Sequence, residues 1–184
     1  REPLQHILGN VNFAGLKIKC DKRALIPRPE TETLVEHILQ RIDPSYDGII
    51  LDMGTGSGAI LAALCFSLPS CSGIGIDYSQ EALSLAGENL KALSLLSRTQ
   101  LRQLDWNIQK VKEEMVGLVV SNPPYLNADE WKSAETEVKE YDPKAALVAE
   151  EKGFSELRKI IGVSAKVLAS GGMLALEFGV SHAD

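Results

Sequence analysis

The stretch SNPPYL, residues 121–126, brings together groups that could hold a planar amino group. A proline pushes the residue before it out of helical geometry, so Asn122 and Pro123 are both expected to be extended, and Pro124 stiffens the corner further. The Asn122 side chain offers one acceptor oxygen, and the Pro123 carbonyl offers another. Two acceptors fixed at one corner can grip both protons of an NH₂ group, and Tyr125 would supply a flat wall beside it.

Such a grip would serve a reaction in which nitrogen attacks a methyl group. An amide or ring NH₂ is a poor nucleophile because its lone pair is delocalised. Holding both protons would orient the nitrogen and stabilise the positive charge that develops on it, and a proton can leave after the transfer. The same residues would also form a rigid turn begun by asparagine, so the motif alone leaves both interpretations open.

A second motif, LDMGTGSGA at residues 51–59, predicts a turn that meets a ligand. Glycines after a strand let the backbone turn tightly and approach a bound molecule. The spacing Gly-x-Gly-x-Gly differs from the Gly-x-Gly-x-x-Gly of dinucleotide-binding turns. The acid before it disfavours a phosphate and suits a cationic ligand, such as the amino group or sulfonium of S-adenosylmethionine; a tight turn without a ligand is the alternative. The candidate donor-binding residues are Asp52, Gly54, Thr55, Gly56, Ser57 and Gly58.

Two further acids follow apolar runs. Asp77 ends the next run, where a carboxylate can bind both hydroxyls of a ribose. Its alternative role is that of an acid favoured by the dipole of the following helix, which Ser79 is expected to cap. Asp105 and Trp106 end a shorter run and offer an acceptor and a flat face for an adenine, although Trp106 would also suit an ordinary half-buried aromatic position.

Apolar runs alternate with segments of helical spacing along most of the chain. Five runs, beginning at residues 49, 73, 99, 116 and 173, predict strands. They are continuously apolar, which is typical of a parallel sheet covered on both faces. Residues 28–42 and 154–168 have helical character, and a β-hairpin is expected around Gly9 and Gly15. We therefore expect a doubly wound, mostly parallel α/β sheet with an N-terminal hairpin, and ligands beyond the carboxyl ends of its strands.

The composition is that of a globular domain. The 184 residues are 45% hydrophobic and 24% charged, and no apolar run approaches the roughly 20 residues that cross a bilayer. The N-terminus lacks the layout of a signal peptide. Cys20, Cys65 and Cys71 form no Cys-x-x-Cys pair, so no metal site is expected. A net charge of -6 argues against broad contact with nucleic acid.

Together the motifs resemble the amino-methyltransferases of the class I S-adenosylmethionine-dependent fold, which is Rossmann-like. The segments that carry this likeness are LDMGTGSGAI, GIDYSQEAL, the dipeptide DW and SNPPYL. Flanking segments make it more specific, because over nearly the whole chain they are similar to the release factor glutamine methyltransferases of the HemK/PrmC type. These flanks are PLQHILGNVNFAGLKI, LIPRPETETLVEHIL, EVKEYDPKAAL and LALEFG.

The resemblance implies N5-methylation of the glutamine in the Gly-Gly-Gln loop of peptide chain release factors, with S-adenosylmethionine as donor and S-adenosylhomocysteine as product. It implies donor contacts at residues 54–58, Asp77, Trp106 and Asn122, and a grip on the glutamine amide by residues 122–125. Arg28 and Glu30, with their neighbours Pro29 and Thr31, would shape the entrance and bind substrate. The implied organisation is a hairpin and linker at residues 1–26 and a catalytic domain at 27–184, truncated at both ends.

The resemblance also implies a monomer that acts on a release factor in the cytoplasm, or in mitochondria if the source is eukaryotic. The sequence departs from the family pattern where His6 replaces a usual tyrosine and where AEEKG, residues 149–153, replaces a glycine-rich stretch. Glu177 ends the last apolar run and is interpreted as structural or as a support for the site.

Other functions are compatible with parts of this pattern. An amino-methyltransferase acting on adenine in nucleic acid would use the same asparagine and proline grip on a ring amine, but it would have to take the base out of its stack. The acidic charge and the lack of a basic recognition segment count against it. A non-catalytic nucleotide-binding domain or a nicotinamide dehydrogenase would share the sheet, and the dehydrogenase is disfavoured by Asp52 and the glycine spacing.

Overall fold

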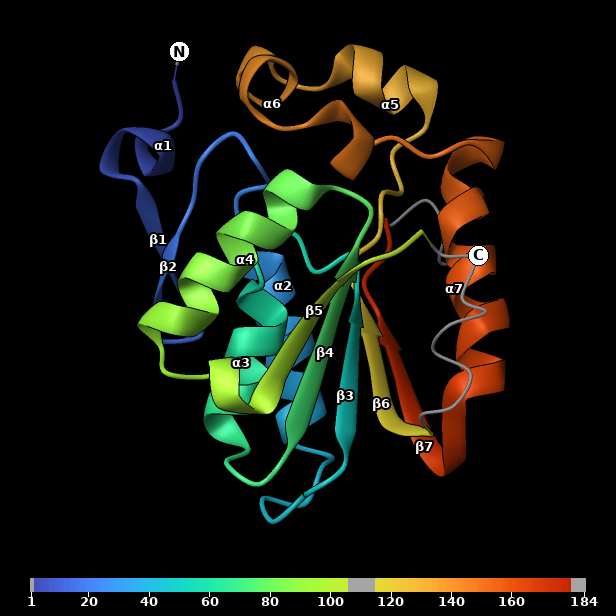
Figure 1. Ribbon diagram of the computed structural model, residues 1–184. Helices are drawn as coiled ribbons and strands as arrows, with labels where there is room; N and C mark the ends of the chain where they lie inside the picture. Colours follow the sequence, from blue (N-terminus) through green and yellow to red (C-terminus); the bar gives the residue numbers. More distant parts are fainter. Residues whose placement is uncertain (1, 106–114, 180–184) are drawn as a thin grey trace.

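A computed structural model describes residues 2–105 and 115–179, and its centre is a parallel sheet of five strands (Figure 1). The strands lie in the order β5-β4-β3-β6-β7. From β3 the chain builds outward through β4 to β5, and it then returns to place β6 on the other side of β3. The order therefore reverses between β3 and β6, which is where doubly wound sheets bind ligands. The bounds are β3 (Ile49–Met53), β4 (Ser72–Asp77), β5 (Thr99–Gln103), β6 (Val116–Ser121) and β7 (Leu168–Leu176).

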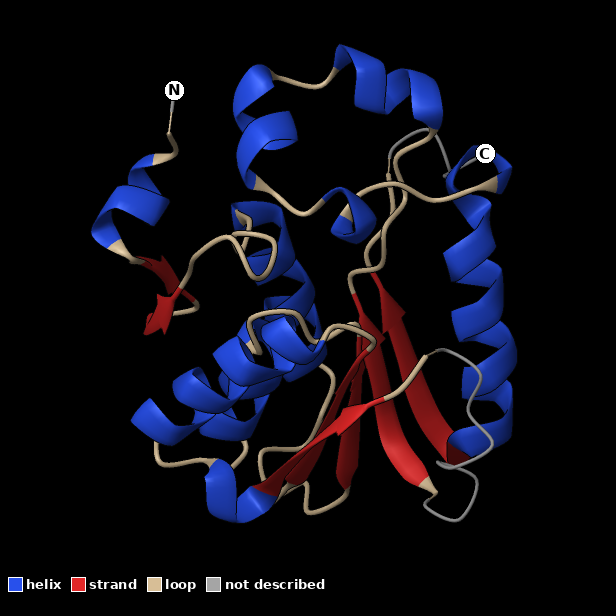
Figure 2. Cartoon of the chain, turned by 45° about the horizontal axis from the view of Figure 1, so that its top comes forward, coloured by secondary structure: helices blue, strands red, loops and turns tan. Residues whose placement is uncertain are grey.

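Helices cover both faces of this sheet (Figures 1 and 2). One face carries α2 (Pro29–Leu39), α3 (Ala59–Ser67) and α4 (Gln80–Ala92), and the other carries α7 (Phe154–Val167). Proline stands at the first position of α2, where its missing N–H costs nothing. Ser79 caps α4 as expected, because its side chain accepts a hydrogen bond from the Ala82 N–H at 3.2 Å. The doubly wound α/β prediction is confirmed.

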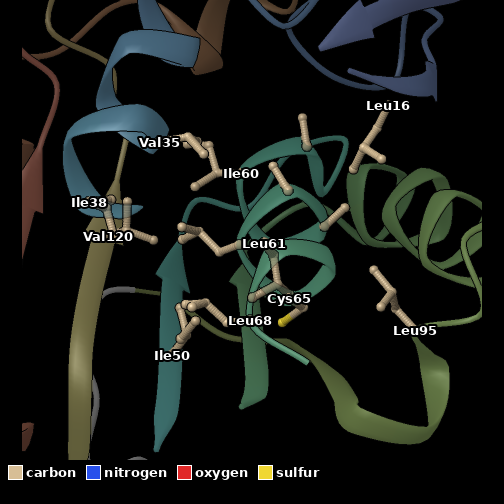
Figure 3. Packing of buried hydrophobic residues seen from close by; sticks show 14 of the residues in the cluster. Leu16, Val35, Ile38, Ile50, Ile60, Leu61, Cys65, Leu68, Leu95 and Val120 are labelled. Atoms are coloured by element: carbon tan, nitrogen blue, oxygen red, sulfur yellow. The ribbon is translucent and has the colours of Figure 1, made fainter. Parts of the chain in front are cut away.

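Alternate strand residues point into two separate cores. Ile50 and Val120 face α2 and α3, and they pack with Val35, Ile38 and Leu61 (Figure 3). Leu51 and Val119 point the other way, into the cluster that α7 completes with Ile160 and Val167. Burial on both faces explains why the strand segments read as unbroken apolar runs.

The predicted hairpin is present as a separate two-stranded sheet of β1 (Asn10–Phe13) and β2 (Leu16–Lys19). Its turn residues Ala14 and Gly15 both have positive φ, as a tight hairpin turn with the sheet's twist requires. Asn89 of α4 ties the hairpin to the main domain, because its side chain accepts from the Lys19 N–H at 2.8 Å and donates to the Lys19 carbonyl at 3.0 Å.

Residues 6–8, which stand just before Gly9 where the hairpin was expected, are not extended. They lie in the short helix α1 (Leu4–Leu8), which ends at Gly9 in the left-handed conformation with φ 68°. A glycine in that conformation commonly stops a helix. The loose apolar alternation of this segment does not distinguish a short helix from an extended strand.

A long segment lies above the carboxyl ends of the strands, at the top of Figure 1. It contains α5 (Ala128–Ser133) and α6 (Thr136–Tyr141), followed by the short 3-10 helices η2 (Lys144–Ala146) and η3 (Glu151–Gly153). Asn127 and Glu130 form a reciprocal capping box at the start of α5. A third 3-10 helix, η1 (Leu96–Arg98), precedes β5. In the described residues no helix is long and apolar enough to cross a membrane.

The last strand begins earlier than predicted. It starts directly after α7 at Leu168 instead of at Met173, and its pairing with β6 is irregular between Val116 and Leu118. After the strand, the Glu177 N–H donates to the Ser121 carbonyl at 3.0 Å. This contact brings Glu177 beside the residue that follows Ser121, which is Asn122.

Candidate functional site

A pocket of about 480 Å³ opens at the carboxyl ends of the strands, beside the point where strand order reverses. Its volume falls within the usual range for small-molecule sites. Most of the sequence-predicted donor residues line it, although they come from four different connections. The lining includes Gly54, Thr55, Gly56, Ser57, Asp77, Tyr78, Leu104, Asp105, Asn122 and Pro124.

The glycine turn is built from backbone that only glycine adopts readily. Gly54, Gly56 and Gly58 all have positive φ, at 75°, 54° and 78°. At Gly58 a side chain is also excluded by packing, because a Cβ would lie 3.0 Å from the Ala86 Cβ of α4. At Gly56 a Cβ would make only an ordinary van der Waals contact, with the Ala24 Cβ 3.8 Å away. Gly58 therefore serves helix packing, and Gly56 leaves room in the pocket.

Asp77 is held at the pocket wall by backbone donors. One carboxylate oxygen accepts from the Gly56 N–H at 3.0 Å, and the other accepts from the Ser79 N–H at 2.9 Å. Burial raises the pKa of Asp77, while the N–H groups of Ser79, Gly56 and Tyr78 act in the opposite direction. Each oxygen keeps acceptor capacity beyond its backbone bond, so the carboxylate can still bind two hydroxyls of a ligand.

Asp52 lies beneath the glycine turn instead of on the pocket wall. It is fully buried, and one oxygen accepts from the Thr55 hydroxyl at 2.7 Å. The other oxygen has no hydrogen-bond partner among the described groups. Burial raises the pKa of Asp52 to about 7, with the charge of Asp77 adding to the effect and the Thr55 bond opposing it. A direct contact between Asp52 and a cationic ligand stays a prediction.

This burial predicts a pH-dependent stability that Asp52→Asn should remove. In the unfolded chain an aspartate loses its proton near pH 4, whereas in the folded protein Asp52 keeps it to about pH 7. Between these values the folded state binds more protons, so stability falls as pH rises. Urea unfolding of both proteins from pH 4 to 8 should show the wild type losing a few kcal/mol relative to Asp52→Asn across this window. Parallel pH profiles would contradict the burial of a titrating carboxyl.

The adenine end of the predicted site is partly described. Asp105 lines the pocket next to Leu104, which follows β5. Trp106 lies outside the described residues, so its predicted stacking role stays a prediction. Opposite them, α7 contributes Glu156 and Lys159, whose side chains form an ion pair at 2.8 Å. No sequence motif marks these two residues, because their segment shows only the pattern of an amphipathic helix.

Asn122 stands between two pockets. It lines the first together with Pro124, and it also lines a second pocket of about 280 Å³ together with Pro123 and Tyr125. Consecutive residues of the predicted grip thus face different sides. The bridge between Leu126 and Val148 pins the end of this segment to the loop above the sheet.

The two predicted substrate-binding residues of the entrance, Arg28 and Glu30, lie in different surroundings. Arg28 lines the second pocket and pairs with the buried carboxylate of Asp142. Glu30 is exposed and is absent from the linings of both pockets.

Burial, with the charges of Glu177 and Glu30, raises the pKa of Tyr125 to about 12, so its hydroxyl keeps its proton at neutral pH. Among the described residues no cluster of His, Cys, Asp and Glu is suited to hold a metal ion.

Thr31 and Glu177 both contact residues of the predicted grip. The Asn122 side-chain NH₂ donates to the Thr31 hydroxyl, which donates to Glu177. In the sequence, Thr31 is 91 residues from Asn122 and 146 residues from Glu177, so no local pattern links the three residues. The family resemblance had placed Thr31 at the entrance, and the position of Glu177 at the end of an apolar run had suggested a structural role or a support for the site.

The chain is similar in sequence to known methyltransferases. The chain is 37% identical to a release factor glutamine methyltransferase of Aliivibrio fischeri over 183 residues, which is 100% of this chain and 63% of that protein. It is 39% identical to the protein of the same name from Thermodesulfovibrio yellowstonii, over 100% of this chain and 66% of the relative. The chain therefore spans less than two thirds of the length of either relative.

The fold is shared with solved methyltransferase structures. The T. thermophilus 16S rRNA N2 G1207 methyltransferase RsmC, solved with AdoMet and guanosine, matches with a TM-score of 0.64 and 18% identity over 91% of this chain and 40% of that one. This likeness confirms the class I, Rossmann-like fold. A sequence model of the methyltransferase small domain matches residues 29–140. That match begins at the first residue of α2, takes in the glycine turn, Asp77 and Asn122, and ends in α6, so the chain belongs to the methyltransferase small domain family.

Proposed function

We propose that the protein transfers a methyl group from S-adenosylmethionine to the side-chain nitrogen of the glutamine in the Gly-Gly-Gln loop of peptide chain release factors. The observation that carries this proposal is the place of Asn122 in the linings of two adjoining pockets. The first pocket has the glycine turn and ribose-binding acid of a donor site. The second is bounded by Pro123 and Tyr125, which suit a planar amide.

The residues present fit the donor. Asp77 would accept hydrogen bonds from the ribose hydroxyls, and the absence of a side chain at Gly56 leaves room against the turn. Asp105, which lines the same pocket, would accept a hydrogen bond from the adenine. S-adenosylmethionine supplies the electrophilic methyl group when bound. Asp52 would stabilise the turn from beneath and would complement the positive charge of this donor when ionised.

The second pocket would hold the acceptor. Asn122 Oδ1 and the Pro123 carbonyl would accept the two protons of the glutamine NH₂, and Tyr125 would pack against the amide plane. The held nitrogen forms a bond to the methyl carbon as the carbon–sulfur bond breaks, with its electron pair left on sulfur. The nitrogen becomes positively charged in the transition state and then loses a proton to water. The two acceptors favour this charge, so a strong base is not required.

A glutamine is favoured over a nucleic-acid base by three observations. The named relatives act on release factor glutamine, the chain carries a net charge of -6, and the second pocket is the smaller of the two. Release factors act during translation, so we place the reaction in the cytoplasm.

Substrate competition would test this choice. The protein is incubated with S-adenosylmethionine labelled in its methyl group, a bacterial release factor and a DNA duplex, and the label on each is counted. We expect label on the release factor and none when its Gly-Gly-Gln glutamine is replaced by alanine. Label on the DNA with none on the release factor would favour the adenine alternative.

A further inference from the structure

Asn122 is not held by its own segment alone. Its side-chain NH₂ donates to the Thr31 hydroxyl at 3.0 Å, and the Thr31 hydroxyl donates to one Glu177 oxygen at 2.7 Å. We refer to these three side chains as the amide relay. The other Glu177 oxygen accepts from the Tyr125 hydroxyl at 3.3 Å. Three separate elements meet here, because Thr31 lies in the first turn of α2 while Asn122 and Glu177 follow the neighbouring strands β6 and β7.

The direction of the hydrogen bonds in the amide relay follows from the chemistry of Glu177. A carboxylate can only accept hydrogen bonds, and a hydroxyl has one proton to give. Once the Thr31 proton is given to Glu177, the Thr31 oxygen can only accept. The Asn122 group that faces Thr31 must then be the NH₂ and cannot be the oxygen.

This direction decides which end of the asparagine amide is free for a substrate. Thr31 is only 4% exposed and is absent from the linings of both pockets. The Asn122 branch that turns away from Thr31 is Oδ1, the acceptor that a substrate NH₂ requires. A flipped amide would present its own NH₂ to the substrate NH₂, donor against donor. It would also set its oxygen against the Thr31 oxygen.

We infer that Thr31 and Glu177 are positioning residues that orient the Asn122 amide so that its oxygen accepts from the substrate nitrogen. This inference rests on the proposed function for its kinetic consequence, but the orientation itself belongs to the protein without substrate. Thr31 lies outside the linings of both pockets, whereas Glu177 also lines the second pocket. Glu177 is held in place by its own N–H bond to the Ser121 carbonyl and by Tyr125.

Three variants separate orientation from packing. Thr31→Val keeps the shape of the side chain and removes the hydroxyl, whereas Thr31→Ser keeps the hydroxyl. Glu177→Met removes the acceptor that sets the direction. We expect Thr31→Val to lower kcat by about tenfold with little change in donor Kd, the ratio that one hydrogen bond of about 1.4 kcal/mol would give. Thr31→Ser should restore most of the rate.

The relay also predicts that the losses do not add. Once Thr31 is valine, Glu177 no longer acts on Asn122 and keeps only its bond from Tyr125, so Glu177→Met should slow the Thr31→Val variant by less than it slows the wild type. Two controls match the chemistry elsewhere. Thr33→Val makes the same change on an exposed position of α2, and Thr99→Val removes a buried hydroxyl that donates to the Leu95 carbonyl. Both should leave kcat unchanged.

A readout without substrate keeps this inference separate from the proposed function. In ¹⁵N-labelled protein the side-chain amide signals of Asn122, assigned by their loss in Asn122→Ala, should move and exchange faster with water in Thr31→Val but not in Thr31→Ser or Thr33→Val. Unmoved signals in Thr31→Val would overturn the relay. If the signals move but the wild type does not methylate a release factor, the relay stands and the proposed function fails. Losses that add fully in the double variant would contradict the relay.

Discussion

Replacing Asn122 with alanine should lower the rate of methyl transfer by about 10²-fold or more while S-adenosylmethionine still binds. The change removes the Oδ1 acceptor at the meeting point of the two pockets, and removal of one fixed group that stabilises transition-state charge typically costs this much. Donor binding should persist because the glycine turn and Asp77 are untouched. Single-turnover rates with a release factor, and calorimetry with the donor, would measure the two effects separately.

Asn12→Ala is the matched control for this prediction. Asn12 is an exposed asparagine on β1, so the same truncation is made outside the site. Its rate should equal that of the wild type. If Asn122→Ala also transfers methyl groups at the wild-type rate, the side chain does not grip the substrate nitrogen and the proposed geometry is wrong.

The second large effect is expected for Asp77→Ala, which should weaken binding of S-adenosylmethionine by about 10²-fold. Two hydrogen bonds from ribose hydroxyls to a carboxylate would be lost, and hydrogen bonds to charged groups contribute about 1.5–3 kcal/mol each. The Gly56 and Ser79 N–H groups would lose their acceptor as well, so the turn itself would loosen. Titration calorimetry with the donor gives the affinity directly.

A control for Asp77→Ala is available in the same chain. Asp43 accepts from the N–H two residues ahead, at Ser45, just as Asp77 accepts from Ser79, but it lies at the end of the domain away from the pocket and is exposed. Asp43→Ala should leave donor affinity unchanged. Equal affinity in Asp77→Ala and wild type would remove the ribose role.

Those elements that local patterns determine could be predicted from the sequence. Continuous apolar runs identified the strands because both faces of this sheet are covered. The turn could be recognised from its glycines because Gly54, Gly56 and Gly58 all have positive φ. The ends of parallel strands must share one edge, so Asp77 and Asn122 could be placed together before the structure was known.

Contacts between distant segments could not be predicted in this way. The amide relay joins Thr31, Asn122 and Glu177 across three elements, and no spacing rule connects them. The burial of Asp52 was missed for a related reason. The side chain of an acid at a strand end can point to solvent or into the turn. Here it points into the turn, where the Thr55 hydroxyl donates a hydrogen bond to it.

Fragmentation mass spectrometry of the product would show whether the methylated atom is a glutamine side-chain nitrogen. A release factor treated with the protein and S-adenosylmethionine is digested, and the peptide that contains Gly-Gly-Gln is sequenced. We expect one added methyl group on the glutamine side chain, absent with Asn122→Ala. A methyl group on another residue, or on no residue while the donor is bound with normal affinity, would contradict it.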